Sequence, residues 1–306
     1  MSAARVISVI LNTNRRDDTL ACLASLARNT YAAHRSVVVN GPGTDGSFEA
    51  IQHAFPETHI LSLADNRGYA GGNNVGLRWA LDQGAEWVLV LNEDTILADD
   101  CLARLVEVGD SDPRIGMVGP MVYHFDEPTV IQSAGGRLGP SWSALLIANN
   151  ELDTGQFRAP QPVEWISGCA MLIRRELLEQ IGLFDERFFI YWEEIDLCQR
   201  ARQAGWQLLH APRARLWHKG VKRDYRPAPA VTYYTTRNLF LLLQKNHAPP
   251  GAWLRVTART LRTLSSWTVK PRWRAMRPHR DAMLQGLYDF ARQRWGRQPA
   301  GPSALP

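Results

Sequence analysis

The sequence predicts an α/β fold: a doubly wound, mostly parallel sheet followed by a helical, basic C-terminal extension. Short apolar runs of strand type alternate with helical patterns through residue 122, and this alternation is typical of βαβ units. From about residue 226 the sequence becomes helical and basic, and it stays so to about residue 297. With 306 residues, 45% of them hydrophobic and 21% charged, the chain is long enough to bury a large core.

The first elements form a βαβ unit. Residues 6–11 and 36–40 are β-branched runs that end in polar turn residues, so we expect two buried parallel strands. Between them, Asp17 or Asp18 is expected to cap a helix whose apolar face turns toward the sheet. That face carries Leu20, Leu23 and Leu26.

The later elements continue this alternation, and residues 123–164, rich in Gly, Pro, Ser and Asn, are expected to form loops with a hairpin. Residues 298–306 are expected to be a disordered tail. Further strands are predicted at residues 59–63, 86–91, 115–122, 169–173, 206–210 and 214–217. Further helices are predicted at residues 73–82, 99–108, 175–181, 193–203 and 233–244.

Charge is distributed unevenly along the chain. Residues 1–212 carry 16 Lys and Arg against 27 Asp and Glu, whereas residues 213–306 carry 19 against 3. This basic part interleaves Trp253, Trp267, Trp273 and Trp295 with arginines, a combination that suits a lipid headgroup boundary. We therefore expect docking to an anionic membrane surface and no nucleic-acid partner. The alternatives are a helical cap whose arginines face solvent, or an oligomer contact such as a homodimer.

The sequence also predicts a location. No run approaches the roughly 20 apolar residues that span a bilayer, and residues 6–11 are too short for a signal-type apolar stretch. Four cysteines lie apart, without the spacing of metal ligands, and each is expected to be a reduced core residue. We expect a cytoplasmic protein, peripheral at the inner face of the cell membrane.

Three carboxylates follow directly on a bulky apolar run. Glu193, Glu194 and Asp196 come after residues 188–192, which are all aromatic or aliphatic. Burial against aromatic groups raises the pKa of a carboxyl toward neutrality, as a general base requires. The alternative is a solvated first helical turn, where acids suit the helix dipole.

Three further segments carry candidate ligand-binding groups. The glycine-rich residues 66–74 suit a ligand with phosphate or sugar hydroxyls, although an ordinary tight turn has the same composition. Asn92 and Asp94 follow a buried strand, where carboxylates can hold Mg²⁺ or cap a helix. His218 gains a role as a ligand only if the fold places it beside Asp94.

These segments, in this order, resemble the inverting glycosyltransferase family 2, in its rhamnosyltransferase-like branch. The resemblance covers residues 6–218 and continues more weakly through Tyr234, Arg237 and Asn238. Its most specific stretches are residues 66–76, 165–173 and 182–218. It implies a GT-A fold over residues 1–225, with a nucleotide-sugar half at about 1–122, an acceptor half at about 123–225, and a helical extension at 226–297.

The resemblance also implies site residues. Asp94 and His218 would hold Mg²⁺ or Mn²⁺ on the donor diphosphate, and Glu194 would be the general base, with Glu193 or Asp196 as alternatives. The acceptor residues would be Gly168, Cys169 and Trp192. The donor residues would be Thr13, Asn14, Asn40, Asp45, Asn66, Gly71, Asn73 and Asn92. Three of these positions depart from the family pattern, which has aspartate in place of Asn40, Asn92 and Glu194.

The implied reaction is metal-assisted transfer of a hexose from a nucleotide diphosphate sugar, with inversion. The best candidate is L-rhamnose from dTDP-rhamnose, transferred to a hydroxyl of a saccharide or lipid-linked saccharide in cell-surface polysaccharide synthesis. The alternative is an inactive homologue that acts as a saccharide- or nucleotide-binding scaffold.

Overall fold

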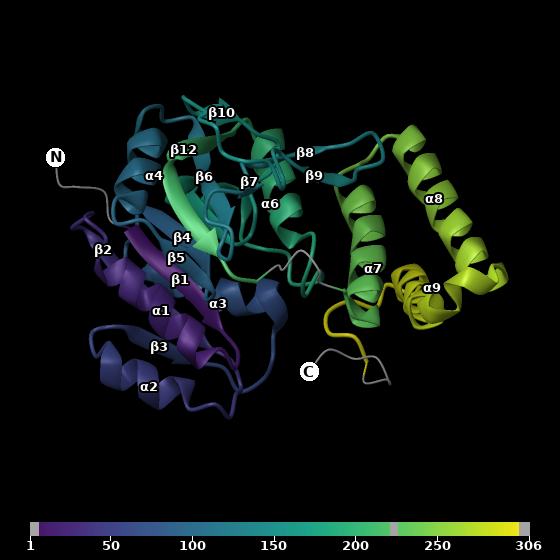
Figure 1. Cartoon of the computed structure of the whole chain (residues 1–306), viewed down its shortest axis with the longest axis horizontal. Coiled ribbons are helices and arrows are strands. Elements are labelled where there is room, and N and C mark those ends of the chain that lie inside the picture. Colours follow the sequence, from purple (N-terminus) through teal and green to yellow (C-terminus); the bar gives the residue numbers. More distant parts are fainter. Residues whose placement is uncertain (1–5, 221–225, 300–306) are drawn as a thin grey trace.

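The computed structural model describes residues 6–220 and 226–299. Over these residues, one large mixed sheet has the strand order β10-β12-β6-β11-β4-β1-β2-β3, with β5 paired to β12 and β7 paired to β6 (Figure 1). Its strands are β1 Val6–Asn12, β2 His34–Asn40, β3 His59–Ser62, β4 Trp87–Asn92, β5 Thr95–Leu97, β6 Ile115–His124, β7 Ile131–Ser133, β10 Gln161–Pro162, β11 Ala170–Arg174 and β12 Gln207–His218. The predicted hairpin is a separate pair, β8 Gly136–Leu138 and β9 Ala144–Leu146.

The sheet reverses its order at β1. This strand is parallel to both β2 and β4, so the chain runs outward through β2 and β3 and then returns to the other side of β1. In open α/β sheets, ligands bind in the crevice beyond the carboxyl ends of strands at such a switch point. Strand β11 runs antiparallel to β4 and β6, so the sheet is mostly but not entirely parallel.

Helices cover both faces of the sheet, as the doubly wound prediction requires. Along β1, Val6 and Ile10 pack in one core with α1 and α4, while Ile7 and Val9 pack in the opposite core with α3, α5, α6 and α7. The α-helices over the described residues are α1 Arg16–Ala27, α2 Ser47–Ala54, α3 Gly68–Asp82, α4 Cys101–Asp110, α5 Arg175–Ile181, α6 Glu193–Gln203, α7 Pro229–Lys245, α8 Pro250–Val269 and α9 Arg277–Ala291.

Several boundaries differ from the prediction. The α1 helix begins at Arg16, so Asp17 and Asp18 lie in its first turn and do not cap it by a side-chain hydrogen bond. Helix α2 and strands β5, β7 and β10 were not expected. The two strands predicted at 206–210 and 214–217 form one strand, β12, with a bulge between Ala211 and Arg215.

The largest error concerns the glycine-rich residues 66–74. Helix α3 begins at Gly68 rather than Asn73, so Gly71 and Gly72 lie inside the helix. A Cβ atom on Gly72 would stand 2.6 Å from Leu11 on β1. These small residues therefore let α3 pack closely on the sheet, and they do not form a loop with free backbone amides.

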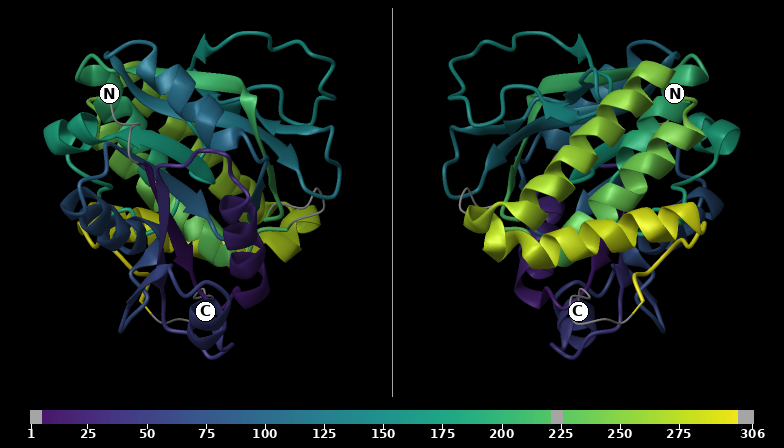
Figure 2. Two further views of the ribbon diagram at one scale, coloured as in Figure 1. Left: turned by 90° about the vertical axis from the view of Figure 1, so that its left-hand side faces the viewer. Right: turned by 90° about the vertical axis from the view of Figure 1, so that its right-hand side faces the viewer.

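The C-terminal helices form one layer beside the α/β unit (Figures 1 and 2). Helix α7 contributes Leu239–Leu243 to the main core, so the extension is not separated from the α/β unit by a break in packing. Helices α8 and α9 follow, joined by a short 3₁₀ helix at Pro271–Met276. Over the described residues, no helix is both long and apolar enough to span a membrane.

Two predictions about single residues can be judged directly. All four cysteines are free and buried, as expected. Gln298, predicted to begin a disordered tail, is only 5% exposed, and its backbone amide donates to the Tyr234 hydroxyl at 2.7 Å. Residues 300–306 of that predicted tail lie outside the described residues.

Candidate active site

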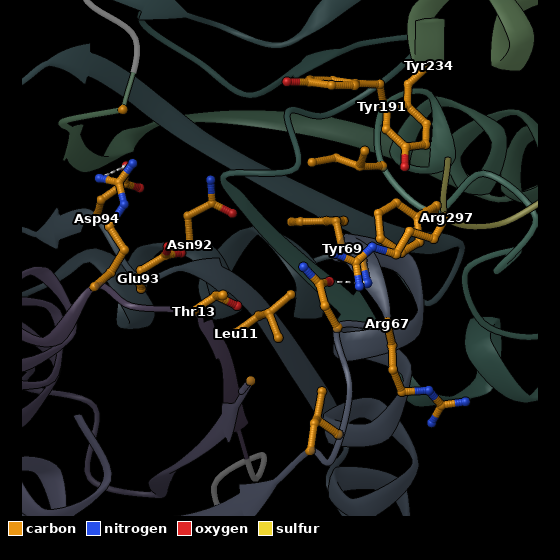
Figure 3. Close-up of a pocket in the computed structure, with 18 of the residues that line it drawn as sticks. Leu11, Thr13, Arg67, Tyr69, Asn92, Glu93, Asp94, Tyr191, Tyr234 and Arg297 are labelled. Atoms are coloured by element: carbon orange, nitrogen blue, oxygen red, sulfur yellow. Dashed lines mark hydrogen bonds and ion pairs between the residues drawn. The ribbon is translucent and has the colours of Figure 1, made fainter. Parts of the chain in front are cut away.

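An open cleft of about 510 Å³ lies at the carboxyl ends of β1 to β4. The sheet side contributes Leu11, Thr13 and the run 92–94, while Tyr191, Tyr234 and other residues line the far side. Figure 3 shows these two groups facing each other across the cleft. The switch point of the sheet therefore coincides with this cleft.

Asp94 and His218 lie side by side in this cleft. Asp94 lies in the turn that follows β4, and His218 is the last residue of β12. Nε2 of His218 is 3.1 Å from Oδ1 of Asp94. Burial raises the pKa of Asp94, but His218 and Arg15 outweigh this effect, so the net shift is downward and the group is a carboxylate at neutral pH. The spacing of the sequence could not establish this proximity.

The surroundings of the pair fit a divalent cation. Oδ1 of Asp94 is buried, and its near neighbour is Nε2 of His218 at 3.1 Å, so the two atoms face the same small space and could bind one cation together. Nδ1 of His218 lies 2.8 Å from Oε1 of Gln132, which holds the ring and directs Nε2 toward Asp94. A Cβ on Gly220 would come within 2.6 Å of Asp94 Oδ2 and 2.9 Å of His218 Nε2, so only glycine leaves this space open.

The pair is not a complete metal cage. The described residues contain no cluster of three or more His, Cys, Asp or Glu side chains that could hold a metal. Mg²⁺ is often bound by one or two carboxylates, with the other positions taken by water and substrate phosphates. Two protein ligands therefore suit a cation that binds together with a phosphorylated substrate.

Two further acidic residues, Glu193 and Glu194, lie at the start of α6. Burial and the neighbouring Glu194 raise the pKa of Glu193 well above its usual range, so Glu193 is the protonated member of the pair. Burial also raises the pKa of Glu194, but backbone hydrogen bonds at the first turn of α6 favour its charged form. Glu193 is 3% exposed, whereas Glu194 is partly accessible, so Glu194 is the better candidate for a base.

Tyr69 connects the acids at the start of α6 to the cleft. Its ring lines the cleft, and its hydroxyl donates to the carbonyl of Gly168 at 2.5 Å. Burial, then Glu193 and Glu194, raise the pKa of Tyr69 well above its usual value, so the phenol stays protonated. Gly168 itself packs against Tyr69 and Glu194, which places Glu194 directly behind this side of the cleft.

Asp196 is removed from the candidates for general base. It is fully buried, and its carboxylate accepts from Arg200 at 2.9 Å, Lys245 at 2.7 Å and Asn246 at 3.1 Å. Because both oxygens are held by cations or amides, the group is a structural anion that ties α6 to the end of α7. The expectation that Asp196 could act as the base is therefore wrong on geometric grounds.

The loop before α6 has an unusual backbone. Phe189, Tyr191 and Trp192 have φ angles of 66°, 68° and 77°, a region that costs energy for residues with a Cβ. The buried side-chain amide of Asn238 holds this loop, donating to the carbonyls of Phe188, Ile190 and Tyr191 at 2.8 to 2.9 Å. The loop that delivers Glu194 is thus fixed by one residue of α7.

Arg237 completes this support. It is fully buried, and all five of its N–H groups donate hydrogen bonds. The acceptors are the side chains of Asn238 and Tyr233 and the carbonyls of Gly296, Arg187 and Phe188. Arg237 and Asn238 together therefore support the loop before α6.

Replacing Asn238 by alanine should therefore lower both stability and turnover. The carbonyls of Phe188, Ile190 and Tyr191 each lose the hydrogen bond from Asn238, and we expect the free energy of unfolding to fall by about 2–4 kcal/mol. Because the loop also sets the start of α6, kcat should fall further than the loss of folded protein explains. Urea unfolding and kcat per folded molecule measure the two effects. Gln244→Ala, an exposed change on the same helix, is the control; equal behaviour of the two variants would contradict a supporting role for Asn238.

The predicted donor residues divide into two groups. Thr13, Asn66 and Asn92 line the cleft. Asn14 and Asp45 do not: Asn14 accepts from the Thr44 amide at 2.8 Å, and Asp45 accepts from the amides of Arg16 and Ser47 at 2.9 and 3.1 Å. Both are turn-forming residues beside a shallow separate depression.

The other three predicted donor residues also lie outside the cleft lining. Asn40 accepts a hydrogen bond from the Asn12 side chain at 2.6 Å, which joins the ends of β1 and β2. Gly71 packs on Arg67 and Glu186, and Asn73 is fully buried, donating to the Tyr69 carbonyl at 2.9 Å. Because α3 begins five residues earlier than predicted, Gly71 and Asn73 belong to a packed helix and not to a binding loop.

The predicted acceptor residues stand behind the cleft. Cys169 is buried, and burial raises the pKa of its thiol to about 12, so it is an inert core residue. Trp192 donates from its indole nitrogen to the carbonyl of Thr235 at 3.1 Å. Gly168 touches Tyr69 and Glu194, so of these three it is the one that contacts a cleft-lining residue and the candidate base.

Sequence reasoning missed several groups at the site. Tyr69 lies in the glycine-rich residues 66–74 but was not predicted as a site residue, and Glu93 lies between the predicted residues Asn92 and Asp94. Burial and Asp94 raise the pKa of Glu93 to about 7. No sequence pattern marks Gln132, Gly220 or Arg297 as a site residue, because their place at the site depends on contacts between distant parts of the chain.

Comparison with solved structures identifies the fold. The mannosyltransferase PcManGT from Pyrobaculum calidifontis, solved in complex with GDP-Man and Mn²⁺, matches with a TM-score of 0.58 and 18% sequence identity. The match covers 94% of this chain and 87% of that chain. The fold is accordingly the GT-A fold of glycosyltransferases, as predicted.

Sequence comparison gives the family. The family described as "Glycosyltransferase like family 2" matches residues 4–248. The chain belongs to this family and is a glycosyltransferase.

Two of the relatives that match most of the chain are named as rhamnosyl transferases. The N-acetylglucosaminyl-diphospho-decaprenol L-rhamnosyltransferase of Mycobacterium tuberculosis is 28% identical over 291 residues, covering 87% of this chain and 93% of the relative. The dTDP-rhamnosyl transferase RfbF of Shigella flexneri is 24% identical over 241 residues, covering 76% of this chain and 79% of the relative.

Proposed function

We propose that this enzyme transfers L-rhamnose from dTDP-rhamnose to a hydroxyl of a lipid-linked saccharide, with inversion at the anomeric carbon. The observation that supports the proposal is the pair Asp94 and His218 in the cleft lining, with Glu194 outside that lining but directly behind the cleft residue Tyr69. The names of the two relatives support rhamnose as the sugar. The Mycobacterium relative supports a diphosphate-linked lipid as the carrier of the acceptor.

The donor occupies the sheet side of the cleft in this proposal. Thr13 and Asn66 contact the nucleotide, and Asn92 contacts the sugar or its phosphate. Asp94 and His218 would hold Mg²⁺ or Mn²⁺, with Gln132 fixing the histidine ring. A divalent cation bound there neutralises charge on the leaving diphosphate.

The acceptor approaches from the side of α6. Glu194 takes the proton of the attacking hydroxyl, while Glu193 stays protonated beside it. Oε2 of Glu194 is buried and makes no hydrogen bond within the described part of the chain, so it has no competing partner there. One displacement, without a covalent enzyme intermediate, inverts the configuration at the anomeric carbon.

Helix α8 provides a surface for the membrane that carries such an acceptor. Its outer side exposes Leu254, Leu261 and Val269, at 73%, 58% and 74%, next to the exposed Arg259 and Arg262. Exposed aliphatic groups beside arginines fit an anionic headgroup layer. The tryptophans contribute less than predicted, because Trp253 and two others pack against aromatic rings of the C-terminal helices or nearby segments.

One experiment tests the reaction and the surface together. N-acetylglucosamine linked through diphosphate to a prenyl chain is placed in phosphatidylglycerol-containing liposomes and incubated with protein, dTDP-rhamnose and Mn²⁺. We expect the release of dTDP, a rhamnosylated lipid product and protein that sediments with the liposomes. GDP-mannose and UDP-glucose are the donor controls, and neutral liposomes are the surface control.

Each part of this proposal can fail separately. Turnover with a different donor would overturn rhamnose but keep the glycosyltransferase. No turnover with any donor or acceptor would favour an inactive binding scaffold. Turnover without sedimentation would contradict the role of α8.

A further inference from the structure

Three arginines line the cleft, and they differ in their partners. Arg15 is paired with Asp18 at 3.2 Å and lies 3.8 Å from Asp94, and Arg67 is paired with Glu186 at 3.4 Å. Among the residues that the structure describes, no carboxylate forms an ion pair with Arg297. The cleft therefore contains a guanidinium that is exposed to solvent and not neutralised by these residues.

The backbone on both sides of Arg297 is held firmly. Gly296 donates to the Arg187 carbonyl at 3.1 Å, and its own carbonyl accepts from Arg237 at 2.8 Å. On the other side, Gln298 donates to the Tyr234 hydroxyl at 2.7 Å. Residues 296–298 thus cross the same loop and helix that support the start of α6, and Arg297 extends from this fixed segment into the cleft.

Arg297 lies on the opposite side of the cleft from the Asp94–His218 pair. Figure 3 shows Arg297 with Tyr191 and Tyr234 on the side of the cleft across from Asp94 and Glu93. The positive charge of the Arg297 guanidinium attracts anions. The guanidinium fork can also donate two parallel hydrogen bonds to the oxygens of a phosphate. The aromatic rings beside it suit the apolar or sugar portion of the same ligand.

We propose that Arg297 binds a phosphate or diphosphate group of a substrate at the end of the cleft away from Asp94. The inference rests on the proposed function, in which two substrates carry such a group: the donor, through its nucleoside diphosphate, and the lipid-linked acceptor, through its diphosphate. The segment 296–298 is then a part of the binding site, supplied by the end of the C-terminal extension.

Binding of two soluble probes distinguishes these sources. Isothermal titration calorimetry of the full-length protein measures dTDP with Mn²⁺ in one arm and farnesyl diphosphate in the other, with farnesol as the neutral reference. The variants are Arg297→Gln, which removes the charge, and Arg297→Lys, which keeps the charge but loses the fork. Arg294→Gln is the matched control, because Arg294 is exposed and lies outside the cleft lining, 4.0 Å from Asp289.

We expect Arg297→Gln to weaken one probe about tenfold or more, as the loss of a charged hydrogen bond implies, with Arg297→Lys in between. Weaker farnesyl diphosphate binding with unchanged dTDP binding would assign Arg297 to the acceptor, and the reverse would assign it to the donor. Unchanged affinity for both probes, or wild-type affinity for farnesyl diphosphate no better than for farnesol together with unchanged dTDP binding, would overturn the proposal. Failure of the wild type to bind dTDP with Mn²⁺ would count against the proposed function, and the farnesyl arm would still report on Arg297.

Discussion

Replacing Glu194 by glutamine is expected to lower kcat by about 10²- to 10⁴-fold, the usual contribution of a general base. Glutamine keeps the size and hydrogen-bonding reach of the side chain but cannot take a proton. Because Glu194 lies away from the residues that hold the donor, the Kd of dTDP with Mn²⁺ should stay within about twofold of the wild-type value. Steady-state transfer and calorimetric binding measure the two quantities.

The pH dependence follows from the environment of Glu194. Burial raises the pKa of this carboxyl, and only the deprotonated form can act as a base. Activity is therefore expected to be complete above the raised pKa and to fall as the pH drops through it, at a higher pH than an ordinary glutamate would give. An activity limb at the usual pKa of a solvated glutamate would contradict the buried base.

Glu193→Gln is the matched control for this prediction. Burial and Glu194 hold the pKa of Glu193 well above its usual range, which favours the neutral form of its side chain. Glutamine should replace it with less than about a tenfold loss of kcat. If Glu193→Gln abolishes turnover and Glu194→Gln does not, Glu193 and not Glu194 is the general base.

Replacing Asp94 by asparagine is expected to remove the metal dependence of donor binding. The wild type should bind dTDP more tightly with Mn²⁺ than with EDTA, because a cation held by Asp94 would neutralise charge on the diphosphate. In Asp94→Asn this difference should disappear, with a loss of at least about tenfold in affinity for dTDP in the presence of Mn²⁺. Titrations of dTDP with and without Mn²⁺ provide the measurement.

Asp99→Asn is the control for the metal prediction. Its side chain is 61% exposed, and Asp99 does not line the cleft, so its loss should change neither titration. An Asp94→Asn variant that still binds dTDP more tightly with Mn²⁺ would show that the cation is held elsewhere. Wild-type binding that is equal with Mn²⁺ and EDTA would remove the metal from the account altogether.

The sequence predicts the framework of the site well, because the framework depends on local patterns. The hydrophobic runs of β1 and β4 are long enough to identify, and polar residues that follow such strands, as Asn92 and Asp94 do, must gather at one edge of the sheet. The apolar run before Glu194 likewise predicts a buried carboxyl, and burial raises the pKa of Glu194 in the structure.

Composition alone could not separate a glycine-rich loop from a glycine-rich helix. Gly72 and Gly76 lie four residues apart and pack against Leu11 and Val9, but this spacing also occurs in loops. The prediction therefore placed Gly71 and Asn73 at the donor. In the structure the segment is helical, and Gly72 and Gly76 allow it to pack closely on β1.

The remaining residues of the site depend on tertiary contacts. Gln132 reaches His218 across 86 positions in the chain, and Arg237 reaches the Gly296 carbonyl across 59. Neither pairing leaves a periodic pattern in the sequence. Asp196 shows the opposite case: it belongs to the acidic run by position, but its side chain turns to Arg200 and Lys245, away from the cleft.

A crystal structure of Glu194→Gln with Mn²⁺ and intact dTDP-rhamnose tests the central claim most directly, because this variant should bind the donor without consuming it. The account predicts an anomalous Mn²⁺ peak within coordination distance of Asp94 and His218, and an anomeric carbon that lies between the diphosphate and the side chain at position 194. A diphosphate bound away from Asp94, or a sugar whose anomeric carbon is turned away from position 194, would contradict it.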